Sequence, residues 1–287
     1  MPVARVRDIE ICCEISGDGP RLLKIWGTGA DLRRPPTGFD RYLATRFTVL
    51  AFDQRGMGRS GKPERDYTMA DYADDAAGLL DAVGWEQAAV LGYSFGGMVA
   101  QEMALRHPRR VERLVLMSTS AGGAGGSSYP LHEWAELDDE TRVRRFLELA
   151  DSRRTPQWQL ANPAQWQSLM DDGMAALQLG ADDPAQRVSR LRQLAARRQH
   201  DTWARLPGLR MPVSVFAGHY DAIATPEVQG RLASRIAGAG YHEFTGGHKF
   251  FVEDPSAAPM IADALGGGFL LPLQGGGREG DGGYGIA

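Results

Sequence analysis

A serine in a tight turn is the residue of this chain best suited to nucleophilic chemistry. Ser94 is the centre of the pentapeptide GYSFG (92–96), which joins a short apolar run at 88–91 to a helical pattern at 95–106. A sharp strand-to-helix turn crowds the backbone, so small residues are needed two positions before and after the serine. Such a turn lifts the hydroxyl onto the edge of a sheet, at the positive end of a helix. We therefore predict that Ser94 is a nucleophile beside backbone amides that stabilise a developing oxyanion.

A serine nucleophile needs a base, and a histidine in a loop at the same sheet edge would supply it. The chain has six histidines. His248 stands in the loop between the last predicted strand and the last predicted helix. Sites of such sheets assemble in loops of this kind, so we predict His248 as the base. The others fall at a helix end, in a predicted helical insertion, in another loop or in a strand: His107, His132, His200, His219 and His242.

An acid must orient the base, and it should follow a strand that lies between the serine and the histidine in the chain. The run "VFAG" at 215–218 leads directly into "HYD" and places Asp221 there. Asp201 lies in the predicted insertion, and Asp254 lies inside or beside the final helix. We therefore predict Asp221 as the acid.

Apolar runs of strand length alternate with helical patterns in both halves of the chain. Because the runs are continuously apolar, they favour a mostly parallel sheet that is covered on both faces. No strand-like run occurs from 129 to about 207, where amphipathic helices are broken at Pro156, Pro163 and Pro184. We predict a core domain at 1–121 and 208–265, a helical insertion at 122–207 and a disordered glycine-rich tail at 266–287. Strands are predicted as a pair within 3–15 and at 21–26, 46–52, 88–91, 111–117, 212–221 and 241–244, and core helices at 68–84, 95–106, 226–236 and 251–265.

Four motifs together make the chain resemble the α/β-hydrolase family over residues 3–265. They are "GYSFGG" around the serine, "DQRGMGRS" after the fourth strand, "AGHYDAIATPE" around the acid and "GGHKFFVEDP" around the base. The order serine, aspartate, histidine is also the order of that family. The resemblance implies an α/β fold with a mostly parallel eight-stranded sheet, helices on both faces and a helical cap after the sixth strand. The insertion at 122–207 stands at the matching point.

The resemblance also implies an oxyanion hole made of two backbone amides. One belongs to the residue after the nucleophile, Phe95, and the other to the loop after the third strand. Thr28 is our choice in that loop and Gly29 the second choice. Family members commonly carry a His-Gly pair there, whereas this chain has Trp26-Gly27. A substrate pocket under the cap is expected to include the following residues, although large side chains also suit the packing of small cap helices: Trp26, Gly29, Tyr93, Trp134, Trp158 and Trp166.

Composition argues against several other classes of protein. The formal net charge is −4 with mixed signs, so no basic surface for nucleic acid is indicated. Cys12 and Cys13 are adjacent and form no disulfide framework, and no signal pattern or long apolar span occurs. We expect a cytoplasmic protein without a membrane segment. GMGRSG at 56–61 matches a dinucleotide-binding pattern, but a polar loop follows it instead of a helix. No histidine pair has metal-ligand spacing, so we expect neither cofactor nor metal.

These observations predict a serine hydrolase that acts on a small molecule. The resemblance suggests a small or medium, fairly apolar ester, thioester or lactone, as in enol-lactonases and small esterases. Hydrolases of C–C bonds in aromatic breakdown, proline iminopeptidases and cofactor-free haloperoxidases are alternatives on the same scaffold. A ligand-binding receptor, or a biosynthetic acyltransferase or cyclase, would also be consistent with these residues. We expect a monomer or a homodimer.

Overall fold

An eight-stranded sheet forms the centre of the molecule. The computed structural model describes residues 3–268. Its strands lie in the order β1-β2-β4-β3-β5-β6-β7-β8, with β3 to β8 parallel and β2 antiparallel to both β1 and β4. The predicted fold class is confirmed. The strands are β1 (Val3–Val6), β2 (Ile9–Ser16), β3 (Arg21–Ile25), β4 (Thr48–Phe52), β5 (Ala88–Tyr93), β6 (Val111–Met117), β7 (Val213–Gly218) and β8 (Gly240–Phe244).

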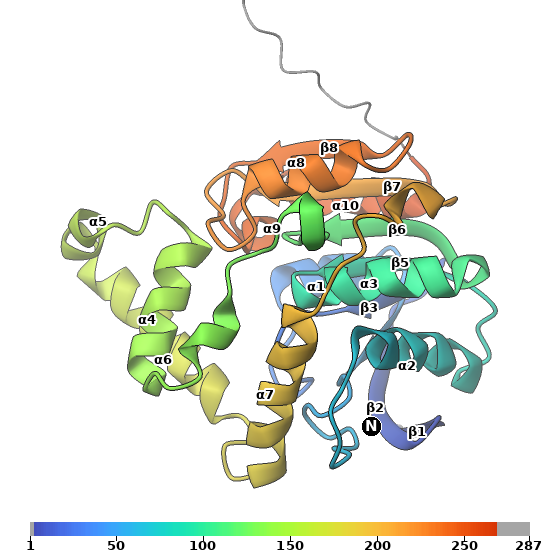
Figure 1. Cartoon of the computed structure of the whole chain (residues 1–287). Coiled ribbons are helices and arrows are strands. Elements are labelled where there is room, and N and C mark those ends of the chain that lie inside the picture. The colour runs from blue at the N-terminus through green and yellow to red at the C-terminus, as the bar shows by residue number, and fades with distance from the viewer. Residues whose placement is uncertain (1–2, 269–287) are drawn as a thin grey trace, which may run out of the picture.

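Helices cover both faces of this sheet (Figure 1). Successive strand residues point to opposite faces, so Leu22 joins one apolar core and Leu23 the other. The core of Leu23 is closed by α2 (Met69–Ala82), α3 (Phe95–Arg106) and α8 (Pro226–Ser234). The core of Leu22 is closed by α1 (Gly38–Ala44), α9 (Phe250–Glu253) and α10 (Ala257–Gly266). Burial on both faces explains why the inner strands β4, β5 and β7 are almost wholly apolar, whereas β1, β2 and β8 carry exposed polar residues.

Two helical elements differ from the prediction. Helix α1 lies where we assigned no element, and the side chain of Thr37 caps it by accepting from the Asp40 amide. The helix predicted at 251–265 is divided into α9 and α10. The division falls before Pro255, which disfavours the helical conformation in Asp254, and Asp254 is extended. The predicted tail at 266–287 lies outside the described residues from 269 onward, and Gly266 still belongs to α10.

Four helices inserted between β6 and β7 make up the segment that we call the cap. They are α4 (Asp139–Ala150), α5 (Pro156–Ala161), α6 (Pro163–Gln178) and α7 (Pro184–Arg198). The prolines predicted to break the helices occupy the first turn of α5, α6 and α7, where a missing N–H costs no helical hydrogen bond. Figure 1 shows α4 to α6 set apart from the sheet, whereas α7 runs beside the core. The chain also has short 3₁₀ helices at η1 (Pro108–Arg110), η2 (Gly123–Gly125), η3 (Leu131–Trp134) and η4 (Leu206–Gly208).

Membrane insertion finds no support in the helices of the structure. Between residues 3 and 268, no helix combines the length and the apolar character that a membrane crossing requires.

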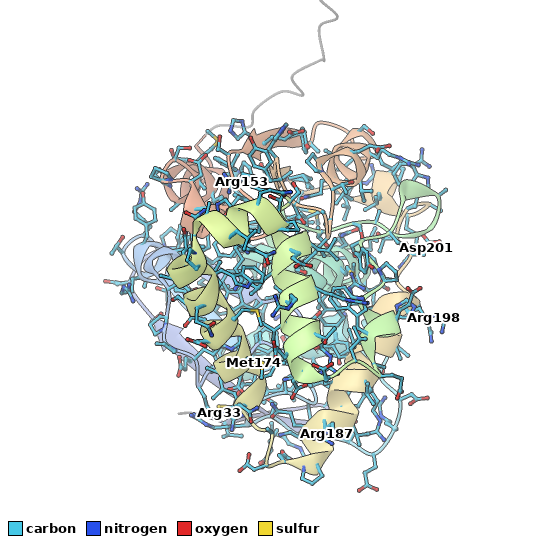
Figure 2. All side chains as sticks on the ribbon, turned by 90° about the vertical axis from the view of Figure 1, so that its left-hand side faces the viewer. Arg33, Arg153, Met174, Arg187, Arg198 and Asp201 are labelled. Carbon is cyan, nitrogen blue, oxygen red and sulfur yellow. The ribbon has the colours of Figure 1, made fainter. Side chains whose placement is uncertain are left out.

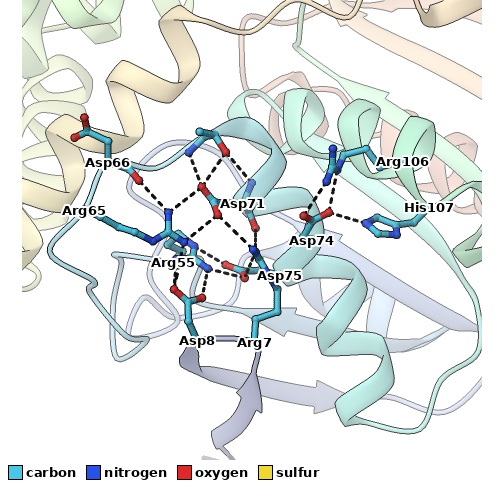
Figure 3. A network of polar contacts seen from close by, with 11 residues as sticks. Arg7, Asp8, Arg55, Arg65, Asp66, Asp71, Asp74, Asp75, Arg106 and His107 are labelled. Carbon is cyan, nitrogen blue, oxygen red and sulfur yellow. Dashed lines mark hydrogen bonds and ion pairs between the residues drawn. The ribbon is translucent and has the colours of Figure 1, made fainter.

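A buried arginine ties the loop after β4 to helix α2 and to the N-terminal hairpin (Figure 3). Arg55 is fully buried, and its Nε and Nη2 each donate to a carboxylate oxygen of Asp75 at 2.8 Å. Nη2 also donates to Asp8 at 2.8 Å, and this guanidinium holds the pKa of Asp8 well below its usual range. Arg7 and Arg65 extend the network at its exposed side. The network fixes the start of the loop that carries the motif DQRGMGRS.

Replacing Arg55 with methionine is expected to lower the free energy of unfolding by about 3–5 kcal/mol, because the buried Asp75 carboxylate loses its main counter-ion. Arg46→Met is a suitable control, since Arg46 and its partner Asp263 are both about half exposed. The control should cost less than about 1 kcal/mol. Urea unfolding of the two variants measures the difference, and equal losses would contradict the structural role of Arg55.

Candidate active site

The turn between β5 and α3 holds Ser94 in a strained backbone conformation. Ser94 has φ 54° and ψ −118°, a region that residues with a Cβ rarely adopt. A Cβ on Gly92 would lie 2.6 Å from the Gly96 carbonyl oxygen, and a Cβ on Gly96 would collide with the carbonyl oxygen of Ile25. Both positions therefore require glycine. The serine side chain stays partly exposed at the end of the strand.

The structure brings together the three residues predicted to form the triad. Nε2 of His248 lies 3.0 Å from Oγ of Ser94, and Nδ1 of His248 lies 2.8 Å from Oδ2 of Asp221. An ionised aspartate only accepts hydrogen bonds, so Nδ1 of His248 carries the proton and donates it to Oδ2. Nε2 is then free to accept from the serine hydroxyl. This arrangement is that of a base poised to deprotonate a nucleophile.

The acid is held by its own loop after β7. Oδ1 of Asp221 accepts from the amides of Ile223 and Ala224 at 2.8 and 2.9 Å. These bonds direct the other oxygen, Oδ2, toward His248. Asp221 and His248 are both nearly inaccessible to solvent, at 2% exposure each. The low dielectric of this burial strengthens the hydrogen bond between the two side chains.

Two backbone amides beside Ser94 have no acceptor within the described residues. They belong to Phe95, which opens α3, and to Thr28. The loop of Thr28 lies against the nucleophile, because a Cβ on Gly27 would be 3.3 Å from Cβ of Ser94. The amide of Gly29, our second choice, instead donates to Oε1 of Gln193 at 2.8 Å. This bond occupies Gly29 and favours Thr28 as the second donor.

Residues 26–32, which we call the oxyanion loop, are held from the core by the start of the DQRGMGRS motif. Nε2 of Gln54 donates to the carbonyl oxygen of Trp26 at 2.8 Å. Oδ1 of Asp53 accepts from the amide of Leu32 at 2.7 Å, and its Oδ2 accepts from the amide of Arg59 at 2.9 Å. Burial raises the pKa of Asp53. The segment that matches a dinucleotide pattern therefore surrounds a carboxylate of the chain itself.

Among the residues that the structure describes, no group of three His, Cys, Asp or Glu side chains is arranged to hold a metal ion.

Aromatic rings surround the base and the strand end. The ring centroid of Tyr93 lies 5.2 Å from that of His248 and 5.0 Å from that of Phe251. Trp26 stacks on Phe251 at 5.4 Å. Phe146, from cap helix α4, approaches His248 edge-on at 6.2 Å. The sequence analysis named Trp26 and Tyr93 but missed Phe146, whose place inside "RRFLELA" gave no signal beyond helical amphipathicity.

The three tryptophans named as pocket residues make packing contacts within the insertion, where Trp158 and Trp166 lie on α5 and α6 of the cap and Trp134 lies in η3. Trp166 is buried in a cluster with Val143 and Met170, and Trp158 packs against the same cluster. Trp134 is buried with its ring 5.2 Å from that of Tyr129. These contacts give all three a packing role, and their place in the substrate pocket stays a prediction.

The C-terminal end of α4 is bonded to the loops of the acid and the base. The amide of His248 donates to the carbonyl oxygen of Ala150, and the amide of Ala222 donates to that of Leu149 at 3.0 Å. A third bond runs in the opposite direction, from the amide of Ser152 to the carbonyl oxygen of Tyr220 at 2.9 Å. The cap therefore fixes the backbone on which two members of the triad are carried.

The remaining histidines are placed away from this hydrogen-bond chain. His107 ends α3 and pairs with Asp74, and the exposed His219 pairs with Glu243. His200 is buried at the end of the cap, and burial lowers its pKa to about 3. His200 is therefore neutral at ordinary pH.

Comparisons with known proteins agree with the fold. The family model of the alpha/beta hydrolase fold matches residues 26–255. A solved hydrolase from Pseudomonas aeruginosa PA01 is 30% identical, with a TM-score of 0.69 over 90% of this chain and 95% of that chain. The enol-lactonase from Burkholderia xenovorans LB400 is 26% identical, with a TM-score of 0.75 over 92% and 100%. The chain belongs to the α/β-hydrolase family, which confirms the predicted resemblance and supports a hydrolase.

Two curated relatives with higher identity are matched over only part of their length. An uncharacterized protein of Mycobacterium tuberculosis is 43% identical over 109 residues, which are 38% of this chain and 31% of that protein. A 2-hydroxymuconate semialdehyde hydrolase from Pseudomonas putida is 36% identical over 146 residues, which are 48% of this chain and 50% of that protein. The matched segments thus span about a third to a half of these relatives.

The burial of His200 predicts how stability changes with pH. The pKa of about 3 in the folded protein is below the ordinary value of 6.5, so the unfolded chain binds a proton first as the pH falls. The stabilisation is complete above about pH 6.5 and is lost progressively toward pH 3. Urea unfolding between pH 7 and 4 measures this effect. As the pH falls, the free energy of unfolding of the wild type should decrease more steeply than that of His200→Asn, by up to about 1.4 kcal/mol per pH unit. His219→Asn, at an exposed site, should keep the wild-type slope, and parallel slopes for all three proteins would contradict the assignment.

Proposed function

We propose that the protein is a serine hydrolase that cleaves a small or medium ester, thioester or lactone through an acyl-enzyme on Ser94. The observation that carries this proposal is the chain of hydrogen bonds from Asp221 through His248 to Ser94. It is supported by the two unpaired amides beside the nucleophile, those of Phe95 and Thr28. A binding protein has no need of a strained serine, an oriented base and an oxyanion site in one place.

The geometry supports the following sequence of steps. Oγ of Ser94 attacks the substrate carbonyl while Nε2 of His248 accepts its proton, and Asp221 stabilises the resulting imidazolium. The amides of Phe95 and Thr28 donate to the oxyanion of the tetrahedral intermediate. The imidazolium then gives its proton to the leaving oxygen or sulfur, and the acyl-enzyme remains. Water attacks the acyl-enzyme with His248 again as base, and the acid product leaves as Ser94 regains its proton.

The first test is hydrolysis of p-nitrophenyl esters with acyl chains of graded length. Ser94→Ala should lower kcat by a factor on the order of 10⁶ because the acyl-enzyme cannot form. Ser168→Ala, at an exposed serine on cap helix α6, is the control and should keep wild-type turnover. The chain length with the highest kcat/KM measures the acyl site. Equal turnover in wild type and Ser94→Ala would refute the proposal.

The same assay separates the rival functions. A receptor on this scaffold would release one equivalent of p-nitrophenol and then stop, whereas an enzyme continues to turn over. An acyltransferase would form a new ester when an alcohol is added, and a hydrolase would still form the free acid. A C–C bond hydrolase would cleave a dienoic diketone faster than any of the p-nitrophenyl esters.

Three cationic side chains near the oxyanion loop and the base form no ion pair within the described residues. Nε of Arg190, on α7, is 3.8 Å from the position that a Cβ on Gly29 would occupy. Arg34 extends from the region after the oxyanion loop, and Lys249 directly follows the base. Partial burial, then repulsion from Arg142 and Arg34, lowers the pKa of Arg190. Desolvation by nearby protein atoms, then repulsion from Arg34 and Arg154, lowers the pKa of Lys249, although Lys249 is exposed to solvent. Arg34 itself is exposed to solvent.

We propose from these cations that the acyl part of the substrate carries a carboxylate. An anion between Arg190, Arg34 and Lys249 would remove the repulsion and supply the missing counter-charge. This modifies the expectation of a fairly apolar substrate, because the aromatic rings near His248 suit an apolar chain whose far end is charged. The names of two relatives, an enol-lactonase and a 2-hydroxymuconate semialdehyde hydrolase, are consistent with small oxygen-rich substrates.

A matched pair of esters tests for the carboxylate. p-Nitrophenyl hexanoate and mono-p-nitrophenyl adipate have acyl chains of equal length, but only the second ends in a carboxylate. Arg190→Met should lower kcat/KM for the adipate ester about tenfold to a hundredfold, the value of one charge-assisted hydrogen bond, and leave the hexanoate ester nearly unchanged. Arg187→Met is the control, because Arg187 is exposed on the surface of the same helix (Figure 2). Equal losses for both esters would refute the carboxylate.

A further inference from the structure

We propose that Gln193, on cap helix α7, is a positioning residue that holds the oxyanion loop in its active form. The proposal rests on the proposed function, because it assigns the second oxyanion donor to the amide of Thr28. Oε1 of Gln193 accepts from the amide of Gly29 at 2.8 Å, across 164 positions of the chain. The side chain of Gln193 is fully buried. Since an amide N–H can only donate, the side-chain atom that faces Gly29 is the oxygen.

The bond acts on the peptide next to the one that supplies the oxyanion donor. The amide of Gly29 and the carbonyl of Thr28 belong to the same planar peptide group. Gly29 has φ +68°, a conformation that glycine adopts freely, so the loop has little intrinsic resistance to rotation there. Gln54 and Asp53 hold the two ends of the oxyanion loop from the core. Within the loop, the amide of Ala30 donates to the carbonyl oxygen of Gly27 at 3.2 Å and closes a turn around the peptide between Thr28 and Gly29. Gln193 is the side chain that holds this central peptide from outside the loop, and its loss is expected to loosen the peptide beside the Thr28 amide.

Helix α7 is hydrogen-bonded to the core, and these bonds fix the position of Gln193. Oγ of Ser189 lies 3.0 Å from the hydroxyl of Tyr67, with Ser189 fully buried. Nη1 of Arg192 donates to the carbonyl oxygen of Pro63 at 2.9 Å. Figure 1 shows α7 running along the core while the other cap helices stand apart. A group that positions a reacting loop needs such rigid support.

The side-chain nitrogen of Gln193 indicates that this residue does not serve stability alone. Nε2 of Gln193 is buried and has no partner within the described residues, and neither has Oγ1 of Thr28 nearby in the oxyanion loop. A buried unpaired donor costs about 1–3 kcal/mol, so an apolar side chain of the same shape would serve packing better. A glutamine at position 193 is explained if its side-chain oxygen is needed to hold the backbone amide of Gly29.

Gln193→Met tests the proposal, with Gln186→Met as the matched control. Gln186 is a buried glutamine on the same helix, and its Nε2 donates to Leu179 of the cap instead. We expect Gln193→Met to lower kcat for a p-nitrophenyl ester about tenfold to a hundredfold with KM within about twofold, because a misplaced donor affects the transition state. Affinity for a trifluoromethyl ketone, which forms an oxyanion on Ser94, should fall by a similar factor. Gln186→Met should leave kcat and this affinity near wild type.

Two further measurements keep the test decisive. Gln193→Glu retains an acceptor for the Gly29 amide, so it should recover part of the kcat lost in Gln193→Met. Amide hydrogen exchange at residues 26–32 should show a protected Gly29 in wild type and a deprotected one in Gln193→Met. Equal kcat in the two methionine variants, a change confined to KM, or unchanged exchange would overturn the proposal. An inactive wild type would refute the hydrolase function, while the exchange result would still decide the role of Gln193.

Discussion

The strained backbone at Ser94 is the constraint on which the rest of the site depends. A positive φ at a residue with a side chain is unfavourable by about 1–3 kcal/mol, so the surrounding structure must enforce it. The parallel sheet enforces it by sending β5 directly into α3, with Gly92 and Gly96 allowing the close approach. The same approach presses the turn against the end of β3 at Ile25. The oxyanion loop, which follows β3, is thereby brought beside Ser94.

Loops at a sheet edge are mobile unless other parts of the molecule hold them. Here the core holds the oxyanion loop through Asp53 and Gln54, and the cap holds it through Gln193. The end of α4 holds the backbone around Asp221 and His248 by main-chain hydrogen bonds. The cap is thus a structural support of residues 26–32 and of the backbone around Asp221 and His248.

Among the residues that the structure describes, cationic side chains are paired with carboxylates in one region of the molecule and lack an ion pair in another. In the network around Arg55, each buried cation faces a carboxylate, and the charges serve the fold. Beside the oxyanion loop, Arg34 repels both Arg190 and Lys249, and these three residues form no ion pair among the described residues. Unbalanced charge of this kind lowers stability and is expected where a ligand completes the balance. The family shares the fold across many reactions, so such local features, and not the sheet, carry the information about substrate.

The sequence by itself determined the sheet, the insertion and the identity of Ser94, Asp221 and His248 as candidates. These follow from local rules, because a tight turn demands glycine, a doubly covered strand is apolar throughout and a site forms where parallel strands end. The break at Pro255 and helix α1 were missed, since boundaries depend on a few residues. Only the tertiary structure showed that the amide of Gly29 donates to Gln193, which favours Thr28 over Gly29 as the proposed second donor. Gly29 and Gln193 are far apart in the chain, and no local sequence pattern indicates that they pair. The packing of the cap on the core decides whether they come into contact.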